Sequence, residues 1–379
     1  MRVIVNGIPL LDLRSGVGNY VYHTFKVMLS IHKEWDIDFY YGLQWSKKLK
    51  DRPVASFVRA RRFTEHLRKI YPLYRNTLAL LFAVGQGWKK FDLYHETNYV
   101  PMQFAGPTVL TIFDLSFHYF PETHPIERIR YLDRHFYSRL NRVSHFITIS
   151  DSVKQEMIDC LSLPQDKITV IPLGVEDCFT PISIDQLSPI TEGYGLKPRA
   201  YILYVGTIEP RKNVFNLLKA YSLLPLSLRV TYPLVLVGEK SWLMEKLDKE
   251  IERLNIQRTI IKTGYVSRED LPALYSGATI FVYPSRYEGF GLPPLEAMAC
   301  GVPVVTSSVS SLPEVVGDAG VLVHPEDIER MAKEIQDLLN NSRRRQMLSA
   351  RGLERSKCFT WRKCAVETLQ VYDRMVQNV

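Results

Sequence analysis

Two glutamates eight positions apart, Glu288 and Glu296, form the pattern with the clearest chemistry in this sequence. Pro293 and Pro294 favour a helix start between them, because proline lacks the N–H that the first helical turn leaves unbonded. The N–H groups of that turn attract an anion, and carboxylates accept hydrogen bonds from hydroxyl groups. We therefore predict binding of a sugar and a ribose that flank a diphosphate, with a helix end stabilised by acids as the alternative. The residues predicted to approach the ligand in this turn are Gly289, Phe290, Gly291 and Leu292.

Arg211 and Lys212 are adjacent cations that follow a buried strand and a turn beginning with Gly206 and Thr207. A diphosphate leaving group gains negative charge as its bond to the sugar breaks, and fixed cations stabilise that charge. The alternative is a pair of solvated surface cations. Because the two cations can do what a metal ion would do, we expect neither a metal ion nor a cofactor.

Gly16 and Gly18 lie in a short segment near the N-terminus that matches half of a dinucleotide-binding fingerprint. The segment follows the first expected strand after about nine residues rather than directly, and Val21 replaces the third glycine. This departure disfavours nicotinamide binding. We expect a glycine loop whose backbone amides contact a phosphate or a sugar, with a plain turn as the alternative.

These residues follow short runs rich in Val, Ile and Tyr that alternate with segments of helical period, a pattern typical of parallel sheets covered by helices. In the first series we predict strands at 3–6, 37–41, 93–95, 109–113, 146–149 and 169–171, and helices at 18–31, 126–142 and 152–161. In the second series we predict strands at 202–205, 234–237, 260–262, 280–283, 304–306 and 321–323, and a final helix at 361–376. Ligands bind beyond the carboxyl ends of such strands, where the candidate residues stand.

A chain of 379 residues exceeds the size that one hydrophobic core usually supports. We therefore predict an α/β fold with two Rossmann-like domains that face a cleft. The N-terminal domain is expected at residues 1–175 and the C-terminal domain at 199–358. Residues 176–198 contain several prolines and glycines and show no sustained period, which predicts an interdomain linker.

Taken together, the motifs resemble those of the family 4 glycosyltransferases, which have the GT-B fold. The matching motifs are E-x7-E from Glu288, G-T-x-E-P-R-K-N from Gly206, G-V-G from Gly16, and Ser310–Val315 followed by Gly320. The resemblance is strongest from Tyr201 to Pro325. It implies an enzyme that moves a sugar from a nucleotide sugar without a metal ion and retains the anomeric configuration. It also implies that a C-terminal helix within 361–379 packs back on the N-terminal, acceptor-side domain.

The resemblance assigns a role to each candidate on the donor side. Glu288 would contact hydroxyls of the donor sugar, and Glu296 would contact the ribose. Arg211 and Lys212 would hold the diphosphate, and Val266 would lie near the base. The glycines that would close over the phosphates from the N-terminal domain are Gly16 and Gly18.

One departure from the family pattern lies on the acceptor side. Family members often read T-I-H-D-L at the end of a strand, whereas residues 111–115 read T-I-F-D-L, with Phe113 in place of the histidine. Asp114 remains, and His118 and Glu122 follow in the same loop, so we expect them to supply polar groups near the reacting sugar. A structural aspartate and a surface histidine are the alternatives.

The implied mechanism brings the acceptor hydroxyl to the face from which the nucleoside diphosphate departs, so no enzymatic nucleophile is needed. Bacterial members of the family often add mannose or another hexose to surface polysaccharides or their lipid-linked precursors. We therefore expect a hexosyltransferase that uses GDP-mannose and a glycan or lipid-linked acceptor. A UDP-hexose donor, a nicotinamide oxidoreductase and a non-catalytic glycan-binding protein are the alternatives.

The formal charge of +8 is concentrated between Lys47 and Lys90, where twelve basic residues accompany two acidic ones. Apolar residues recur every three or four positions over residues 57–74, with arginines and lysines between them, as in a basic amphipathic helix that Pro72 ends or kinks. We predict peripheral contact with an anionic membrane through residues 57–84. Packing of the apolar face on the N-terminal sheet is the alternative. We expect no nucleic-acid partner.

The cysteines and the apolar runs indicate a compartment. Five cysteines without a C-x-x-C pair suit neither a disulfide framework nor a zinc site. No apolar run approaches the roughly 20 residues of a membrane-spanning helix, and the first residues predict a buried strand rather than a signal peptide. We therefore expect a cytoplasmic protein that is peripheral on the cytoplasmic face of the membrane.

Overall fold

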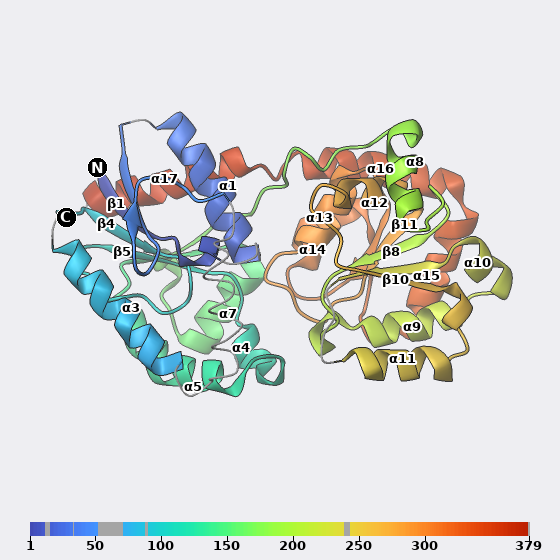
Figure 1. Ribbon diagram of the computed structural model, residues 1–379, viewed down its shortest axis with the longest axis horizontal. Helices are drawn as coiled ribbons and strands as arrows, with labels where there is room; N and C mark the ends of the chain where they lie inside the picture. The colour runs from blue at the N-terminus through green and yellow to red at the C-terminus, as the bar shows by residue number, and fades with distance from the viewer. Residues whose placement is uncertain (12–15, 33, 52–70, 88–89, 239–242, 378–379) are drawn as a thin grey trace. The chain divides into compact units, whose positions relative to one another are not determined.

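The computed structural model describes the chain except residues 12–15, 33, 52–70, 88–89, 239–242 and 378–379. The chain forms two compact units, each built around its own sheet (Figure 1). Unit 1 consists of Met1–Gly174 and Trp361–Val379, and unit 2 consists of Val175–Thr360. Both units are α/β structures, as the alternation of apolar runs and helical segments predicts.

Unit 1 contains a seven-stranded sheet in the order β3-β2-β1-β4-β5-β6-β7. Its strands are β1 (Arg2–Asn6), β2 (Asp36–Tyr40), β3 (Trp45–Ser46), β4 (Leu93–Glu96), β5 (Thr108–Ile112), β6 (His145–Thr148) and β7 (Ile168–Val170). The paired strands run parallel except β3, which lies antiparallel to β2. The sequence does not predict β3, because two residues are too few to show a period.

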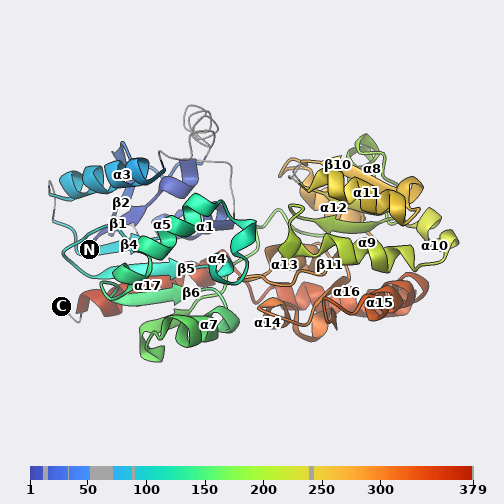
Figure 2. The ribbon, with the colours of Figure 1, turned by 90° about the horizontal axis from the view of Figure 1, so that it is seen from below.

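The helices of unit 1 cover both faces of this sheet. They are α1 (Gly16–Ile31), α3 (Tyr71–Gln86), α4 (Ser116–Tyr119), α5 (Ile126–His135), α6 (Tyr137–Leu140), α7 (Asp151–Leu161) and α17 (Trp361–Gln377). Figures 1 and 2 show α1 and α17 on one face and α3, α5 and α7 on the other. The helix expected at 126–142 is two helices, which meet at Phe136.

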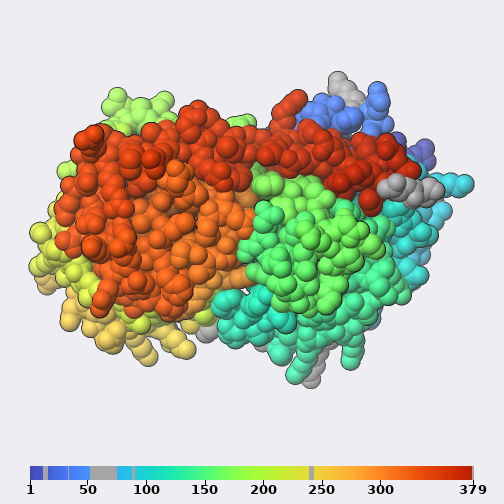
Figure 3. Space-filling view, turned by 180° about the vertical axis from the view of Figure 1, so that it is seen from behind, coloured from blue at the N-terminus to red at the C-terminus, as the bar shows by residue number. Residues whose placement is uncertain are grey.

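The final helix, α17, belongs to unit 1, as the family resemblance implies. It packs beside α1, where Thr24 Oγ1 lies 3.5 Å from Cys364 Sγ. It also reaches the sheet, where His95 Nδ1 in β4 lies 2.5 Å from the hydroxyl of Tyr372. Figure 3 shows α17, in dark red, at the surface of unit 1. The last helix of the chain thus completes the unit that the first strand begins.

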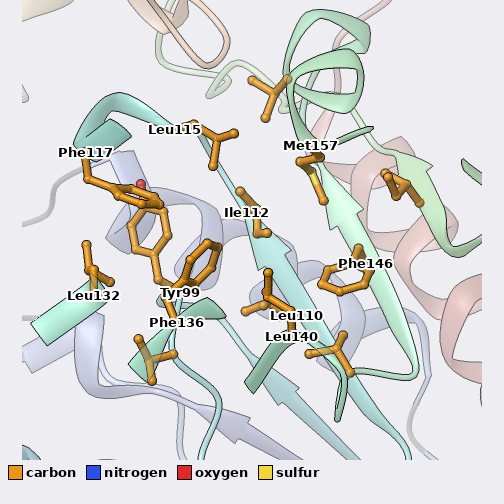
Figure 4. Packing of buried hydrophobic residues seen from close by; sticks show 14 of the residues in the cluster. Tyr99, Leu110, Ile112, Leu115, Phe117, Leu132, Phe136, Leu140, Phe146 and Met157 are labelled. Atoms are coloured by element: carbon orange, nitrogen blue, oxygen red, sulfur yellow. The ribbon is translucent and has the colours of Figure 1, made fainter. Parts of the chain in front are cut away.

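The hydrophobic core of unit 1 on the α5 side holds Tyr99, which contacts the candidate residue Asp114. The rings of Tyr99, Phe117 and Phe136 meet edge to face, with centroids 5.2 to 6.2 Å apart (Figure 4). Strand, helix and loop residues of the same cluster include Leu110, Ile112, Leu115, Phe146 and Met157. Because the ring of Tyr99 is held in this core, its hydroxyl has a fixed position, 2.8 Å from Asp114 Oδ1.

Unit 2 contains a six-stranded parallel sheet in the order β10-β9-β8-β11-β12-β13. Its strands are β8 (Ile202–Val205), β9 (Leu234–Val237), β10 (Ile260–Gly264), β11 (Ile280–Tyr283), β12 (Val304–Ser307) and β13 (Val321–Val323). Its helices are α8 (Ile184–Gly193), α9 (Val214–Ser222), α10 (Leu226–Thr231), α11 (Met244–Arg253), α12 (Leu271–Gly277), α13 (Leu292–Ala299), α14 (Leu312–Val316), α15 (Ile328–Asn340) and α16 (Ser342–Ser356). Chain order reverses between β8 and β11, which makes their carboxyl ends the switch point of the sheet.

The linker predicted at 176–198 is wrong for much of its length, because α8 occupies its centre and the segment belongs to unit 2. The prolines and glycines there hide the helical period. Pro189 lies inside α8, while Leu187 and Thr191, four positions apart, are buried. The segment that follows is tied to α12 by a 2.7 Å hydrogen bond from the Tyr194 hydroxyl to Asp270.

The basic amphipathic helix expected at 57–74 falls mostly outside the described residues, which resume at Tyr71. Pro72 is the second residue of α3, and the helix that Pro72 was expected to end or kink lies outside the described residues. Proline is tolerated there because the first turn of a helix needs no N–H donor. The apolar run at 78–84 lies within α3.

The backbone after β9 approaches the backbone after β8 closely. A Cβ added to Gly238 would lie 2.1 Å from the carbonyl oxygen of Gly206. We predict that Gly238→Ala lowers the free energy of unfolding by about 1–3 kcal/mol, because backbone atoms cannot yield as a side chain can. Thermal unfolding checks this. Gly193→Ala is the matched control, because a Cβ at Gly193 meets no atom within 4 Å. Equal melting temperatures for the two variants would contradict the prediction.

Candidate active site

The candidate site of unit 2 lies beyond the carboxyl ends of β8 and β11, at the switch point of the sheet. The loop after β8 carries Gly206, Thr207 and a short 3-10 helix, Pro210–Lys212, which contains both cations. The loop after β11 carries Glu288 and leads into α13. The two loops, far apart in sequence, therefore meet because β8 and β11 are neighbours in the sheet.

Local constraints hold the loop after β11 in shape. Gly291 has a φ of +127°, and a Cβ there would lie 2.9 Å from Leu312 Cδ2, so the position favours glycine. The hydroxyl of Ser310 donates to the carbonyl of Glu288 at 2.6 Å, and the hydroxyl of Ser311 lies 2.8 Å from that carbonyl. The serines of the segment Ser310–Val315 thus fix the backbone of Glu288.

Glu288 forms ion pairs with both cations. Lys212 Nζ lies 2.6 Å from Glu288 Oε1, and Arg211 Nη1 lies 3.3 Å from Glu288 Oε2. Arg211 Nη2 lies 3.3 Å from Glu209 Oε2 as well. The side chains of Lys212, Arg211 and Glu288 are only 10 to 15% exposed, so the two cations are not solvated surface charges. The structure thus brings together Arg211, Lys212 and Glu288, which the sequence analysis selected from separate motifs.

Tyr283, the last residue of β11, joins this cluster and is absent from the sequence prediction. Its hydroxyl donates to Glu288 Oε1 at 2.8 Å and accepts from Lys212 Nζ at 2.7 Å. The side chain is fully buried. The sequence feature that could have identified Tyr283 is a tyrosine at the carboxyl end of an otherwise apolar strand, next to the candidate site.

The cluster sets the protonation state of Glu288. Burial opposes the charged form, but the positive charges of Lys212 and Arg211 outweigh it and lower the pKa of Glu288 to about 2. Glu288 is therefore ionised at neutral pH and acts as a hydrogen-bond acceptor. It is unsuited to donate a proton there.

Glu296 has a separate set of partners. It lies buried in α13, where the Tyr275 hydroxyl donates to Oε2 at 3.0 Å and Arg268 Nη2 lies 3.3 Å from Oε1. Arg268 also pairs with Glu176. Burial raises the pKa of Glu296, although Arg268 and Tyr275 partly offset the effect. The carboxylate predicted to contact the ribose thus already has an ionic and a hydrogen-bonding partner within the chain.

The other residues predicted to bind the nucleotide-sugar donor differ in their exposure to solvent. Thr207 is exposed, and its hydroxyl donates to Glu209 at 2.9 Å. The side chain of Val266 is buried, whereas the neighbouring Tyr265, at the carboxyl end of β10, is 66% exposed. The side chain of Phe290 is buried as well, and its ring meets that of Phe359 edge to face. Gly289 and Gly291 are buried, and Leu292 is partly exposed at the start of α13.

In unit 1, Asp114 follows β5 and holds the start of α4. Its Oδ1 accepts from the Tyr99 hydroxyl and, at 2.9 and 2.7 Å, from the backbone N–H and hydroxyl of Ser116. The histidine that the structure brings to this network is His124, whose Nε2 lies 3.0 Å from Ser116 Oγ. The predicted residues His118 and Glu122 are both exposed.

The glycine loop expected at Gly16 and Gly18 is wrong as a description of the backbone, because both glycines lie in the first turn of α1. Gly16 is exposed, and a Cβ there would meet no atom within 4 Å. A helix start and a glycine loop both present backbone N–H groups, which explains why the sequence pattern did not distinguish them. Contact of this turn with a phosphate stays a prediction.

The described part of the chain contains no group of three or more His, Cys, Asp or Glu side chains placed to hold a metal ion. Asp36 and Asp38 lie on one face of β2, but Asp36 forms an ion pair with Lys47. The charged groups of the candidate site are instead two cations and their carboxylate partners.

Known proteins resemble this chain over nearly its whole length. The family models "Glycosyltransferase Family 4" and "Glycosyl transferases group 1" match residues 14–177 and 192–355. Over 379 residues the chain is 36% identical to O-antigen chain mannosyltransferase B of Escherichia coli, with 98% of this chain and 99% of that protein covered.

Among solved structures, the chain is similar to sucrose-phosphate synthase from Thermosynechococcus elongatus, with a TM-score of 0.77, 21% identity, and 100% and 99% of the two chains covered. It is also similar to HepE of Anabaena in complex with UDP and glucose, with a TM-score of 0.70, 16% identity, and 99% and 100% covered. These likenesses show a shared fold over nearly the whole chain.

The lowered pKa of Glu288 predicts how stability depends on pH. A carboxyl whose pKa is lower in the folded state contributes stability that is complete above its ordinary pKa of 4.5 and is lost as the pH falls toward 2. Glu288→Gln removes this group. We predict that the difference in free energy of unfolding between wild type and variant narrows from pH 6 to pH 3, because over this range the Glu288 carboxyl takes up a proton in the unfolded chain but stays ionised in the folded one, and the variant has no such carboxyl. Urea unfolding measures it, and a constant difference would contradict the assignment.

Proposed function

The chain belongs to the family 4 glycosyltransferases of the GT-B fold, and on that premise we propose that it moves mannose from GDP-mannose to a glycan or lipid-linked acceptor in the synthesis of a surface polysaccharide. The observation that carries the donor side is the buried cluster of Arg211, Lys212 and Glu288. The choice of mannose is supported by the full-length similarity to a protein named O-antigen chain mannosyltransferase B. A UDP-hexose donor is the second candidate.

The geometry supports a division of labour within the cluster. Lys212 and Arg211 stabilise the diphosphate as it departs, which is where negative charge develops in the transition state. Glu288, ionised and next to both cations, accepts hydrogen bonds from hydroxyls of the sugar. Glu296, close behind the start of α13, contacts the ribose.

We propose that the transfer retains the anomeric configuration. The acceptor hydroxyl approaches the face from which the diphosphate leaves, and the departing phosphate accepts its proton. The reaction then needs neither an enzymatic nucleophile nor a metal ion, because positioning and the two cations supply the stabilisation. On the acceptor side we propose Asp114 as the polar group, with His118 and Glu122 in the same loop. A non-catalytic glycan-binding protein would have no use for a buried pair of cations beside a carboxylate.

The experiment that tests the function is a comparison of GDP-mannose, UDP-glucose and their nucleoside diphosphates by thermal shift and by transfer or hydrolysis assays in excess EDTA. We expect GDP and GDP-mannose to raise the melting temperature, because ligands that bind only the folded state stabilise it. We expect turnover to persist in EDTA. Loss of activity on chelation, with recovery on adding manganese, would falsify metal independence, and stabilisation by UDP compounds alone would move the donor to a UDP-hexose.

Variants separate the roles within the same assay. Arg211→Ala or Lys212→Ala should lower turnover at least about tenfold, because one lost contact to a developing charge is worth about 1.4 kcal/mol or more. Glu288→Gln should damage transfer while nucleoside diphosphate affinity is kept, whereas Glu296→Ala should weaken that affinity. Equal affinity losses in calorimetry would show that the roles are wrongly divided. Near-normal transfer by Asp114→Asn would remove Asp114 from the site.

We also propose a cytoplasmic location with peripheral contact to an anionic membrane through residues 57–84. No helix of the described chain is long and apolar enough to span a membrane. The described part of the segment, α3, exposes Leu80 and Val84 to solvent at 65 and 54%. Exposed apolar side chains beside a basic stretch are what an interfacial helix requires, and contact with a lipid surface would bring a lipid-linked acceptor to the enzyme.

Sedimentation with liposomes tests the membrane proposal. We expect the protein to sediment with anionic but not neutral vesicles, with less bound at high salt because salt screens the attraction. Arg59→Glu, Arg61→Glu and Arg62→Glu together should abolish binding, and Leu80→Ser with Val84→Ser should weaken it. Asn76→Ser, also exposed on α3, is the matched control. Equal binding to anionic and neutral vesicles would contradict the membrane proposal.

A further inference from the structure

We propose that Tyr283 is a positioning residue of the transfer reaction, whose hydroxyl keeps Glu288 and Lys212 in their working places while the donor is bound. The inference rests on the proposed function of the cluster and adds a residue to it. Tyr283 is argued to act through its two neighbours and not by touching the donor.

The first support is a triangle of short contacts. Lys212 Nζ, Glu288 Oε1 and the Tyr283 hydroxyl lie 2.6, 2.7 and 2.8 Å from one another. The phenol donates its single proton to the carboxylate and accepts from the ammonium group, so it bridges the two charges with both of its hydrogen-bonding functions in use. A neutral group in that position satisfies both ions at once.

The second support is that the ring has no freedom to move. Tyr283 is fully buried, and its ring stacks on Tyr204 and on Phe281, with centroids 5.9 Å apart in each pair. Burial and the nearby carboxylate of Glu288 raise the pKa of Tyr283 well above its usual range, so the hydroxyl keeps its proton at any working pH. The bridge is therefore rigid in position and constant in charge.

The third support comes from what donor binding demands. A diphosphate attracts Lys212, and that attraction competes with the direct pairing of Lys212 with Glu288. The Tyr283 hydroxyl offers Lys212 a neutral acceptor and offers Glu288 a neutral donor, so each ion can turn to the ligand without losing all support. Preorganised groups of this kind stabilise the transition state more than the bound substrate, because they need no rearrangement as charge develops.

Removing only the hydroxyl tests the idea, since Tyr283→Phe keeps the buried ring and its stacking. We expect kcat to fall about tenfold while KM for the donor changes less than about threefold, because the loss is felt mainly in the transition state. Tyr201→Phe is the matched control. Tyr201, the residue before β8, is also fully buried, and its hydroxyl donates to the carbonyl of Leu274 at 2.5 Å, away from the cluster. We expect its kcat to stay within about twofold of wild type.

A double-mutant cycle separates positioning from a general loss of packing. With Lys212→Met as background, adding Tyr283→Phe should cost less than about twofold, because the bridge no longer has two ions to hold. The inference is overturned if Tyr283→Phe behaves like Tyr201→Phe, if only KM changes, or if the full effect persists in the Lys212→Met background. Wild-type turnover of nucleotide sugars is measured in the same series. Its absence rejects the proposed function, whereas a normal wild-type rate with an unaffected Tyr283→Phe rejects the role of Tyr283 alone.

Discussion

The site of unit 2 depends on one electrostatic constraint, which is that charged groups removed from water must be paired. Glu288 and Lys212 are each about one-tenth exposed, and neither would be tolerated there alone. The partners come from loops after β8 and β11, so the sheet must place these two strands side by side. Ser310 and Ser311 hold the backbone of Glu288, and Gly291 allows the turn that precedes α13. Both contribute to the pairing, because a shift of this loop would leave Lys212 without its carboxylate partner.

The same constraint bears on how the proposed nucleotide-sugar donor would bind. Glu209 and Glu288 balance Arg211 and Lys212, so the four side chains together carry no net charge. On the proposed function, an anionic diphosphate would therefore gain its contacts by exchanging partners with these carboxylates. Glu288, displaced from part of its pairing, would then be able to accept hydrogen bonds from sugar hydroxyls.

Much of the fold could be predicted from the sequence, because buried parallel strands appear as short runs of Val, Ile and Tyr; β8, β9, β11 and β13 have the predicted bounds. The predictions failed where the spacing of residues along the chain does not show the structure. The linker prediction failed at α8 because Pro189 interrupts the helical period without interrupting the helix. In the site, adjacent cations and the E-x7-E motif identified Arg211, Lys212 and Glu288. Tyr283 and His124 were missed because they act through contacts that strand order and loop geometry create, and neither is visible as spacing along the chain.

The packing of α17 on unit 1 has a consequence for how the protein is made. Unit 1 is discontinuous: its last helix is encoded after the whole of unit 2. During synthesis the first 174 residues emerge without the helix that covers α1 and bonds to His95 from its buried Tyr372, whereas unit 2 is a continuous segment. Unit 1 therefore cannot be completed until all of unit 2 has been synthesised. A chain that lacks α17 would keep the sheet of unit 2, which holds the cation cluster, but would lose the helix that covers α1 in unit 1. Proteases that remove incomplete proteins would therefore cleave unit 1 first.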